Sequence, residues 1–284
     1  MNLSSLWKRL RKGPKSMSII DDLSFLIRES QEQYRAQAMD HTTSHGLNDF
    51  RRDPFLFHKK VSGLIEEEDR PAFSVGRAAH TLILEGREAY REQYVFGGPV
   101  NPKTGQPYGR YTKAFEEWAT AQGKPVIDNE QALLIENIND SVRNHPLAVD
   151  LLSEGIAEGV VRAPYMDMPC QARLDWLNPH RGIVDLKTTD TLTFLEGSAR
   201  VYGYIHQLAF YRALVFQATG KLIPAFIIAV EKREPYRSGV WAIGPDVLGA
   251  AQKENEQAME RLTDCRRLDQ WPTGYENLRT IDWL

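Results

Sequence analysis

The stretch GIVDLKTTD, residues 182–190, places an acid and a lysine inside an apolar strand. Its apolar residues include two that are β-branched, which favours a buried, extended conformation. Because strand side chains alternate between faces, we expect Asp185 and Lys187 to share one face, and Val184 and Leu186 to point to the other. Charged groups in a buried strand need partners, so this pair marks a candidate site of chemistry.

A second acid lies on the strand expected just before this one. In the stretch QARLDWL, alternation places Asp175 on the same face as Arg173 and Leu177. The sequence NPHRG that follows is typical of a turn. If the turn is centred on His180, Asp175 falls directly opposite Asp185. A slip of one residue would instead place the two acids on opposite faces.

Two facing carboxylates predict a metal site. Like charges opposite each other destabilise a sheet, and each would raise the pKa of the other. A divalent cation between them removes both problems, and hard oxygen ligands suit Mg²⁺, for which Mn²⁺ can substitute. Lys187 could then reach a water or a phosphate and stabilise charge in a transition state. A lone acid-x-lysine is more often a surface ion pair, but here an acid-bearing strand precedes it.

The wider pattern predicts the elements that position these residues. Strands are expected at 156–166, 170–177, 182–188, 223–231 and 239–244. Helices are expected at 19–40, 74–86, 111–122, 129–152, 194–220 and 246–264. This order predicts one α/β (α+β) domain over residues 18–284, in which a mixed central sheet is flanked by helices and preceded by a helical elaboration.

Composition narrows the class of protein. A formal net charge of −3 gives no overall signal for binding a polyanion, so contact with nucleic acid would need a local basic surface or metal ions held on acids. Two distant cysteines cannot build a disulfide framework, a zinc site or a four-cysteine cluster. No run is long and apolar enough to span a membrane, so we expect a cytoplasmic protein. Residues 1–17 predict a basic, mobile arm, with a membrane-surface helix as the alternative.

The ordered motifs resemble a known family. Asp175, Asp185 and Lys187 match the PD-(D/E)xK nuclease signature, in which an acid on one strand is followed by acid-x-lysine on the next. Within that superfamily the chain resembles the RecB-type nucleases, and most of all the C-terminal nuclease domain of the RecE (exonuclease VIII) family and its phage-borne relatives. The resemblance covers roughly residues 40–284 and implies the restriction-endonuclease-like core. Residues 1–16 have no counterpart in it.

Three further motifs carry the resemblance. GRAAHTLILEG resembles the Gly-x-x-x-His helix and gives His80, and QLAFY resembles the Gln-x-x-x-Tyr motif and gives Gln207 and Tyr211. AEGVV resembles the strand with an acid before the first metal ligand and gives Glu158. The family implies that His80, Asp175, Asp185 and the Leu186 carbonyl hold the cations.

Each of these residues also has a plainer interpretation. His80 could be an ordinary residue of its helix, although the small residues before it could let that helix pack close to a sheet. Gln207 and Tyr211 share a helix face, which predicts that they position Lys187, water or a phosphate, although core packing would explain Tyr211 alone. Glu158 could hold a metal-bound water or simply end a strand.

The segment 97–113 is a long loop rich in glycine and proline, and such loops often carry function. We expect its bases Lys103, Arg110 and Lys113 to contact the DNA backbone, with solvated surface charge as the alternative.

The resemblance implies a function as well as a fold. It implies a Mg²⁺-dependent exodeoxyribonuclease that digests the 5′-ended strand of linear double-stranded DNA and leaves 3′ overhangs. Implied partners are DNA ends, a single-strand annealing protein of the RecT type, and copies of the chain itself in a homo-oligomeric ring, of four by analogy. An endonuclease, or a DNA-end-binding protein without catalysis, could use the same fold.

Overall fold

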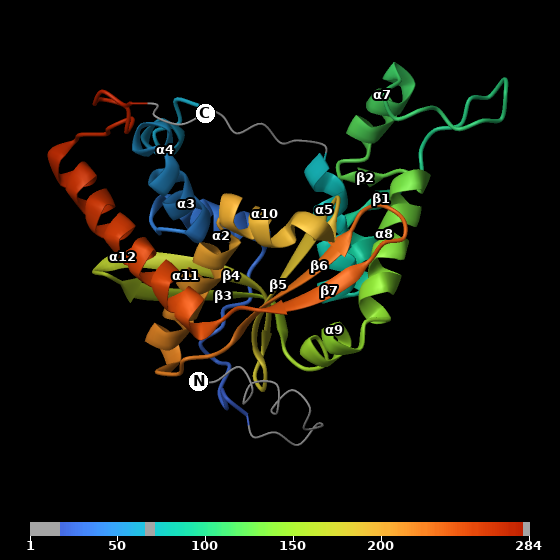
Figure 1. Ribbon diagram of the computed structural model, residues 1–284. Helices are drawn as coiled ribbons and strands as arrows, with labels where there is room; N and C mark the ends of the chain where they lie inside the picture. Colours follow the sequence, from blue (N-terminus) through green and yellow to red (C-terminus); the bar gives the residue numbers. More distant parts are fainter. Residues whose placement is uncertain (1–17, 66–71, 281–284) are drawn as a thin grey trace.

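The computed structural model describes residues 18–65 and 72–280. They form one five-stranded mixed sheet with helices packed around it (Figure 1). The strands lie in the order β3-β4-β5-β6-β7. β5 and β6 are parallel, and the other neighbours are antiparallel. The strands are β3(Ile156–Tyr165), β4(Met168–Asn178), β5(Gly182–Thr189), β6(Ala225–Glu231) and β7(Ser238–Ala242). A separate parallel pair joins β1(Val95–Phe96) and β2(Val126–Ile127).

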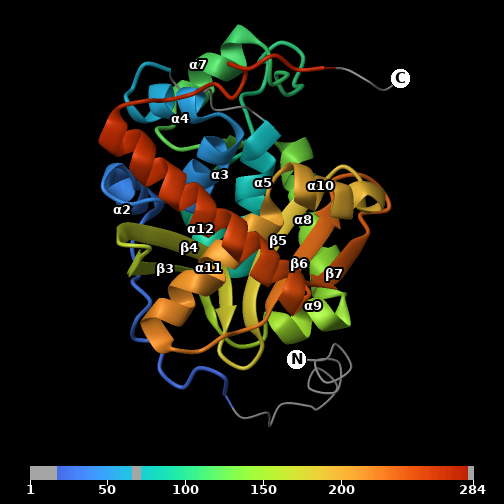
Figure 2. The ribbon, with the colours of Figure 1, turned by 60° about the vertical axis from the view of Figure 1, so that its left-hand side comes forward.

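Helices cover both faces of the sheet (Figures 1 and 2). On one face an apolar cluster joins the sheet to α3(Ser44–Arg52), α11(Tyr204–Thr219) and α12(Pro245–Leu268). On the other face a second cluster involves α5(Ala72–His80), α6(Arg87–Gln93), α8(Asn129–Arg143) and α9(Pro146–Leu151). The remaining described helices are α2(Gln31–Ala36), α4(Pro54–Val61), α7(Lys113–Ala121) and α10(Leu195–Val201), with the short turns η1(Gln37–Met39), η2(Thr81–Glu85) and η3(Leu192–Phe194).

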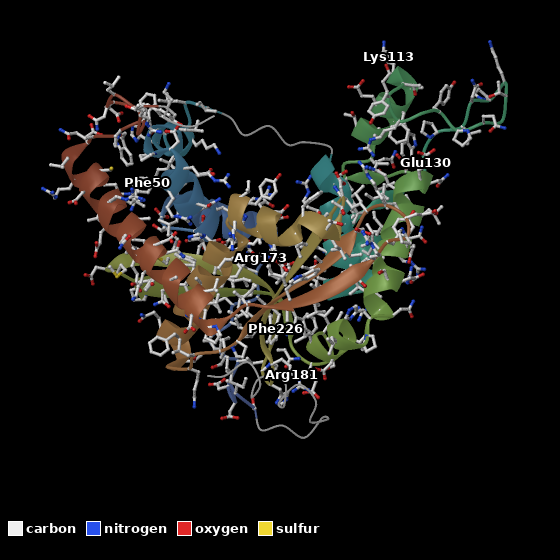
Figure 3. All side chains as sticks on the ribbon, in the orientation of Figure 1. Phe50, Lys113, Glu130, Arg173, Arg181 and Phe226 are labelled. Atoms are coloured by element: carbon white, nitrogen blue, oxygen red, sulfur yellow. The ribbon has the colours of Figure 1, made fainter. Side chains whose placement is uncertain are left out.

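The two clusters explain why the central strands are apolar on both sides. Phe50 of α3 belongs to the first cluster and Phe226 of β6 to the second (Figure 3). All seven residues of β6 are buried, as its continuous apolar sequence predicts. In β5, Ile183 packs into the first cluster, while Val184 and Leu186 pack into the second. The predicted alternation of β5 is therefore confirmed, and it places Asp185 and Lys187 on the side of Ile183.

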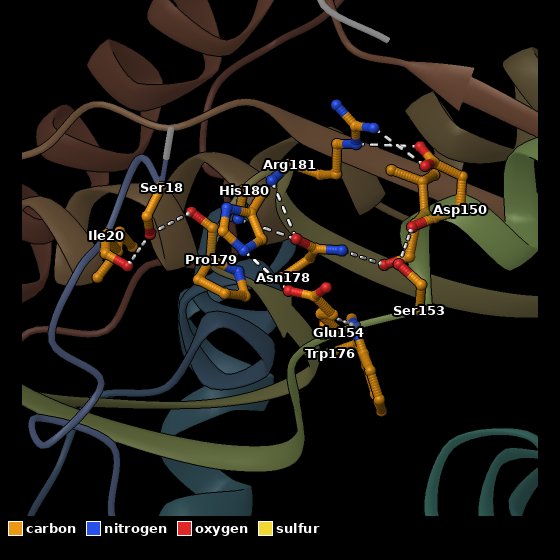
Figure 4. A network of polar contacts seen from close by, with 11 residues as sticks. Ser18, Ile20, Asp150, Ser153, Glu154, Trp176, Asn178, Pro179, His180 and Arg181 are labelled. Atoms are coloured by element: carbon orange, nitrogen blue, oxygen red, sulfur yellow. Dashed lines mark hydrogen bonds and ion pairs between the residues drawn. The ribbon is translucent and has the colours of Figure 1, made fainter. Parts of the chain in front are cut away.

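A polar network holds the turn between β4 and β5 (Figure 4). The Asn178 Oδ1 atom accepts hydrogen bonds from the backbone N–H groups of His180 at 2.9 Å and Arg181 at 3.1 Å. The Asn178 amide donates to the Leu151 carbonyl at 2.9 Å, and the Arg181 guanidinium pairs with Asp150 at 3.0 Å. The turn is thus tied both to itself and to α9. It sets the pairs Trp176↔Val184, Leu177↔Ile183 and Asn178↔Gly182, which is the predicted register.

Replacing Asn178 should destabilise the fold. Asn178→Ala removes three hydrogen bonds from a residue that is 2% exposed, and the Arg181 N–H keeps only its longer bond to the Asn178 backbone carbonyl, at 3.3 Å. We expect the free energy of unfolding to fall by about 1–3 kcal/mol. Denaturant melts of the purified variant would measure this. Asn178→Asp keeps the acceptor and loses the donor, so its loss should be smaller, and equal losses would contradict the role given to the turn.

Three of the predicted helices are wrong in extent. The predicted helix 129–152 is divided into α8 and α9, because His145 before Pro146 takes an extended conformation. The predicted helix 19–40 is helical only in α2 and η1, because Ile27 forms a two-bond bridge with Val160 of β3 and residues 19 and 20 bond to the Pro179 carbonyl. The predicted helix 194–220 is divided into η3, α10 and α11. Gly203, at φ +74°, turns the chain where a side chain would collide with Asn48.

Two expectations about the ends and the environment of the chain have different outcomes. The basic arm predicted at residues 1–17 lies outside the described residues. Within the described part, no helix combines the length and apolar composition needed to cross a bilayer.

Candidate active site and metal centre

The site forms where β4 and β5 separate. Their paired ladder ends at Trp176↔Val184, one residue before Asp175 and Asp185 would face each other. At that point the Asp175 side chain bonds to β5 in place of the β4 backbone: its Oδ2 atom accepts a hydrogen bond from the Leu186 N–H at 2.8 Å. A carboxylate has replaced a backbone carbonyl in the ladder. The two strands therefore part, and their acids lie beside the opening.

Strict alternation fails on β4 at the same level. Leu174 and Leu177 pack into the same apolar cluster although they are three residues apart, and Trp176 packs into the other. The prediction that Arg173 and Leu177 share a face is therefore wrong. The reason lies on β3, where Glu158 has a left-handed φ of +54° between the pairs Ala157↔Trp176 and Gly159↔Leu174. A non-glycine residue in this conformation is strained, and such strain often occurs at functional sites.

Helix α5 brings His80 to the opening. A Cβ atom on Gly76 would lie 3.2 Å from Thr188 Oγ1 of β5, and Ala78 and Ala79 are fully buried. The small residues let the helix approach the sheet closely, as expected. A π-type turn, η2, follows His80 directly, and such turns are frequent at functional sites. The Nδ1 atom of His80 lies 3.7 Å from Asp175 Oδ2.

Three of the predicted residues form a group that can hold a metal ion. Ligand atoms of His80, Glu158 and Asp175 all lie within 4.8 Å of one another. Arg173 approaches the group from β4, with its Nε atom 2.6 Å from Glu158 Oε2. The arginine neutralises part of the negative charge and holds the glutamate carboxylate in place.

Asp185 and Lys187 complete the centre from β5. Asp185 Oδ2 lies 2.5 Å from Lys187 Nζ, and the Asp185 side chain is only 1% exposed. Apart from this ion pair, neither carboxylate oxygen of Asp185 has a hydrogen-bond partner among the described residues. Buried carboxylate oxygens without donors are what a cation would satisfy. With the Leu186 backbone beside them, the donor set fits a divalent metal.

Protonation in the site follows from burial. Burial raises the pKa of Asp185 to about 6 against the opposing effect of Lys187, and it raises the pKa of Glu158 to about 8 with a further contribution from Asp175. Burial lowers the pKa of His80 to about 4, and Lys187 lowers it further. His80 is therefore neutral at pH 7, the form in which imidazole binds metals. Burial makes both acids easier to protonate than exposed acids, and a bound cation would oppose that effect.

Helix α11 contributes a second layer. Gln207 Nε2 donates to the Tyr211 hydroxyl at 2.7 Å, so this pair packs together on one helix face, as predicted. It does not contact Lys187 directly, as one of the predicted roles would require. Tyr204 does so instead, with its ring centroid 4.9 Å from Lys187 Nζ. Burial raises the pKa of Tyr211 well above its ordinary value, so its hydroxyl stays protonated.

Three residues around the centre were not predicted from the sequence. Tyr204 lies three residues before Gln207 and so shares its helix face, a spacing that could have revealed it. Arg173 lies two residues before Asp175, and strand alternation predicts that the two share a face, but it does not reveal the ion pair with Glu158. Tyr34 is half-buried, with its pKa raised to about 12 by desolvation and Arg173 among its charged neighbours, and no local signal in the sequence links it to β4.

The three bases predicted to contact DNA lie away from this centre. The loop and α7 project beyond the sheet, and Lys113 lies far from Arg173 in Figure 3. Arg110 pairs with Asp128 at 3.4 Å, and Lys113 pairs with Glu117 at 3.6 Å on an exposed surface. Lys103 is exposed near the tip of the loop. Their contact with DNA stays a prediction.

His80 should matter for metal binding more than for DNA binding. We expect His80→Ala to raise the Mg²⁺ concentration for half-maximal activity about tenfold or more, because one ligand of the group is lost. Titration of nuclease activity against Mg²⁺ would measure this shift, and His180→Ala, in the turn at the other end of the hairpin, is the control. An unchanged titration curve would return His80 to an ordinary helix residue.

Comparisons with known proteins agree with the fold. A model of the family described as "PDDEXK-like domain of unknown function (DUF3799)" matches residues 44–282. A search of curated proteins finds no match. Among solved structures, the chain is similar to one from Eubacterium rectale described as a "Putative exonuclease", with a TM-score of 0.65 and 17% sequence identity over 90% of this chain and 96% of that one. Because the family model matches most of the chain, and the motif residues meet where β4 and β5 separate, the chain belongs to the PDDEXK-like family DUF3799.

Proposed function

We propose that the chain is a Mg²⁺-dependent exodeoxyribonuclease that digests linear double-stranded DNA. One observation carries the proposal. Asp175, Asp185, Lys187 and His80 converge where β4 and β5 separate, and apart from the ion pair with Lys187 the buried oxygens of Asp185 have no hydrogen-bond donor among the described residues. That set of groups suits metal-assisted phosphodiester hydrolysis, since the carboxylates can hold a cation and an ammonium lies beside them.

The residues of the site would divide the work between them. Asp175 and Asp185, with the Leu186 carbonyl and neutral His80, would hold divalent metal, which supplies an activated water and shields the charge of the phosphate. Lys187 would bind a non-bridging phosphate oxygen and stabilise the charge that develops there. Glu158, held by Arg173, would orient water at the edge of the centre. Gln207 and Tyr211 would keep Tyr204 and the helix beside Lys187 in position.

Digestion of matched DNA topologies tests the proposal. We expect linear duplex to be consumed with Mg²⁺ or Mn²⁺, closed circular duplex to survive, and EDTA to stop the reaction. An endonuclease would cut both forms, and a DNA-end-binding protein without catalysis would cut neither. Asp185→Asn, prepared in parallel, excludes a contaminating nuclease.

The polarity and the partner rest on the resemblance to RecE-type nucleases. The proposal is that the 5′-ended strand is digested and that the 3′ overhang passes to a single-strand annealing protein of the RecT type. Duplexes labelled at one 5′ or one 3′ end distinguish the polarities. A 5′ label released as mononucleotide at the start of the reaction supports the proposal, and early release of a 3′ label contradicts it.

We also propose a homo-oligomeric ring, of four copies by the same resemblance. A chain with a net charge of −3 has little overall attraction for DNA, whose binding depends mainly on phosphate neutralisation. A closed ring would hold DNA topologically and bring together the bases of several copies. We expect light scattering to give an oligomeric mass and digestion to continue past a trap-DNA chase. A monomeric mass with processive digestion would contradict the topological argument.

A further inference from the structure

A series of aromatic rings leads from the catalytic amine to solvent. The Tyr204 ring lies over Lys187, with 4.9 Å between the ring centroid and Nζ. The Tyr202 ring stacks on Tyr204, with 5.9 Å between centroids and 28° between planes. Tyr202 is 58% exposed, whereas Lys187 is 18% exposed. The outer ring therefore presents a flat apolar face to solvent two rings away from the group that would contact the phosphate.

The backbone that carries Tyr202 is held firmly. Gly203 turns the chain between α10 and α11 and packs where a side chain would collide with Asn48 of α3. The Asn48 amide donates to the Tyr202 carbonyl at 3.5 Å, and the Arg52 guanidinium donates to the Val201 carbonyl. Two bonds from α3 thus tie down this elbow. A ring on a fixed backbone loses little conformational freedom when a ligand stacks on it.

Two arginines flank the elbow. Arg200 and Arg52 both have exposed side chains, and no ion pair of either is found within residues 18–65 and 72–280, although Arg52 also donates to the Val201 carbonyl. An exposed aromatic face beside exposed arginines is a combination that binds single-stranded nucleic acid, because the ring stacks on a nucleobase while the cations contact phosphates. A purely structural exposed tyrosine needs neither its basic neighbours nor its connection to Lys187.

We propose that Tyr202 stacks on an unpaired nucleobase of the strand being cut, close to the scissile phosphate. The inference rests on the proposed function and deepens it by naming what this surface takes. A base inside a duplex has both faces covered by its neighbours, so the stacked base must lie at the DNA end, where a nucleotide separated from its partner can turn a free face to the ring. Tyr202 thereby keeps the frayed end open, and Tyr204 connects it to Lys187.

Tyr202→Ala should lower kcat/KM on blunt duplex by about 5- to 100-fold, which corresponds to the loss of one stacked base. Tyr202→Phe and Tyr202→Trp keep a flat ring and should retain activity. Melting temperature should not change, because the side chain is exposed. Tyr275→Ala is the matched control, since Tyr275 is 73% exposed and lies beyond the last described helix.

Abasic DNA identifies the contact itself. Duplexes carrying one abasic nucleotide at each of the first several positions of the digested strand are compared for wild type and Tyr202→Ala. At one position, the abasic nucleotide should lower the digestion rate of the wild type as much as Tyr202→Ala lowers the rate on normal DNA. At that position the variant should digest the abasic and the normal duplex at the same rate. If the effect of Tyr202→Ala is the same at every abasic position, the ring does not contact a base and the inference is overturned.

Two further measurements keep the conclusions separate. Binding of a short single-stranded oligonucleotide, followed by anisotropy with Ca²⁺ in place of Mg²⁺, should weaken in Tyr202→Ala whether or not cleavage occurs. Wild-type binding and digestion by Tyr202→Ala, with Asp185→Asn inactive, would overturn the stacking inference and leave the nuclease proposal intact. A change in oligomeric mass in Tyr202→Ala would assign the ring to a contact between copies and also overturn the inference.

Discussion

Asp185→Asn is expected to reduce DNA digestion by about 10³-fold or more while the protein still folds. The carboxylate is 1% exposed, and its oxygens have no described hydrogen-bond donors apart from the ion pair with Lys187. An amide has almost the same shape but no charge, so it holds a divalent cation far more weakly and does not complete the electrostatics of the site. Initial rates on linear duplex over a range of Mg²⁺ concentrations measure the loss.

The matched control is Asp190→Asn, the same change five residues later. Asp190 is 59% exposed and pairs with Lys232 at 3.2 Å on the surface. We expect its rate to match wild type. A digesting Asp185→Asn protein, free of contaminating nuclease, would show that the acid on β5 does not belong to the chemistry.

Asp185→Asn should also change how the stability of the protein depends on pH, in a direction that the pKa of Asp185 fixes. Burial raises the pKa of Asp185 to about 6 from an ordinary value of 3.8. As the pH rises between these values, the unfolded chain releases a proton that the folded chain keeps, so stability is lost. The amide never ionises. Without divalent metal, Asp185→Asn should therefore melt above wild type at a pH well above 6, and the difference should disappear below 3.8.

Lys187→Met is expected to lower kcat by about 10²- to 10³-fold and to leave the metal dependence nearly unchanged. The ammonium is held by Asp185 at 2.5 Å and by the ring of Tyr204, so it is aimed at the centre without being a metal ligand. Methionine keeps most of the apolar stem and removes the charge. Single-turnover rates at saturating Mg²⁺ would separate the chemical step from binding.

Two controls accompany this variant. Lys187→Arg keeps the charge but spreads it over a planar group too large for the place, so we expect it to restore little activity. Lys232→Met makes the same lysine-to-methionine change at a surface ion pair after β6, and we expect its kcat to match wild type. Wild-type kcat in Lys187→Met, or a loss that high Mg²⁺ reverses, would reassign the lysine to a structural role.

Local spacing determined much of this protein. The β5 alternation, the turn after Asn178 and the resulting register between β4 and β5 were all predictable, because each depends on residues within a few positions of one another. The same holds for the close packing of α5, which follows from its small residues. The hairpin brings Asp175 and Asp185 near each other in any fold that keeps the two strands together, and the small residues of α5 let His80 approach once that helix packs on the sheet.

Only the tertiary structure decided how the site opens. The separation of the strands at Asp175, the left-handed Glu158 opposite it, and Arg173 beside Glu158 depend on three strands meeting. Tyr204 reaches Lys187 only because the predicted long helix breaks at Gly203, where Asn48 of a distant helix leaves no room for a side chain. Each of these features results from a contact between segments far apart in the chain. Local propensity and periodicity carry no record of such contacts, so the strained and functional geometry was the part that the sequence alone could not determine.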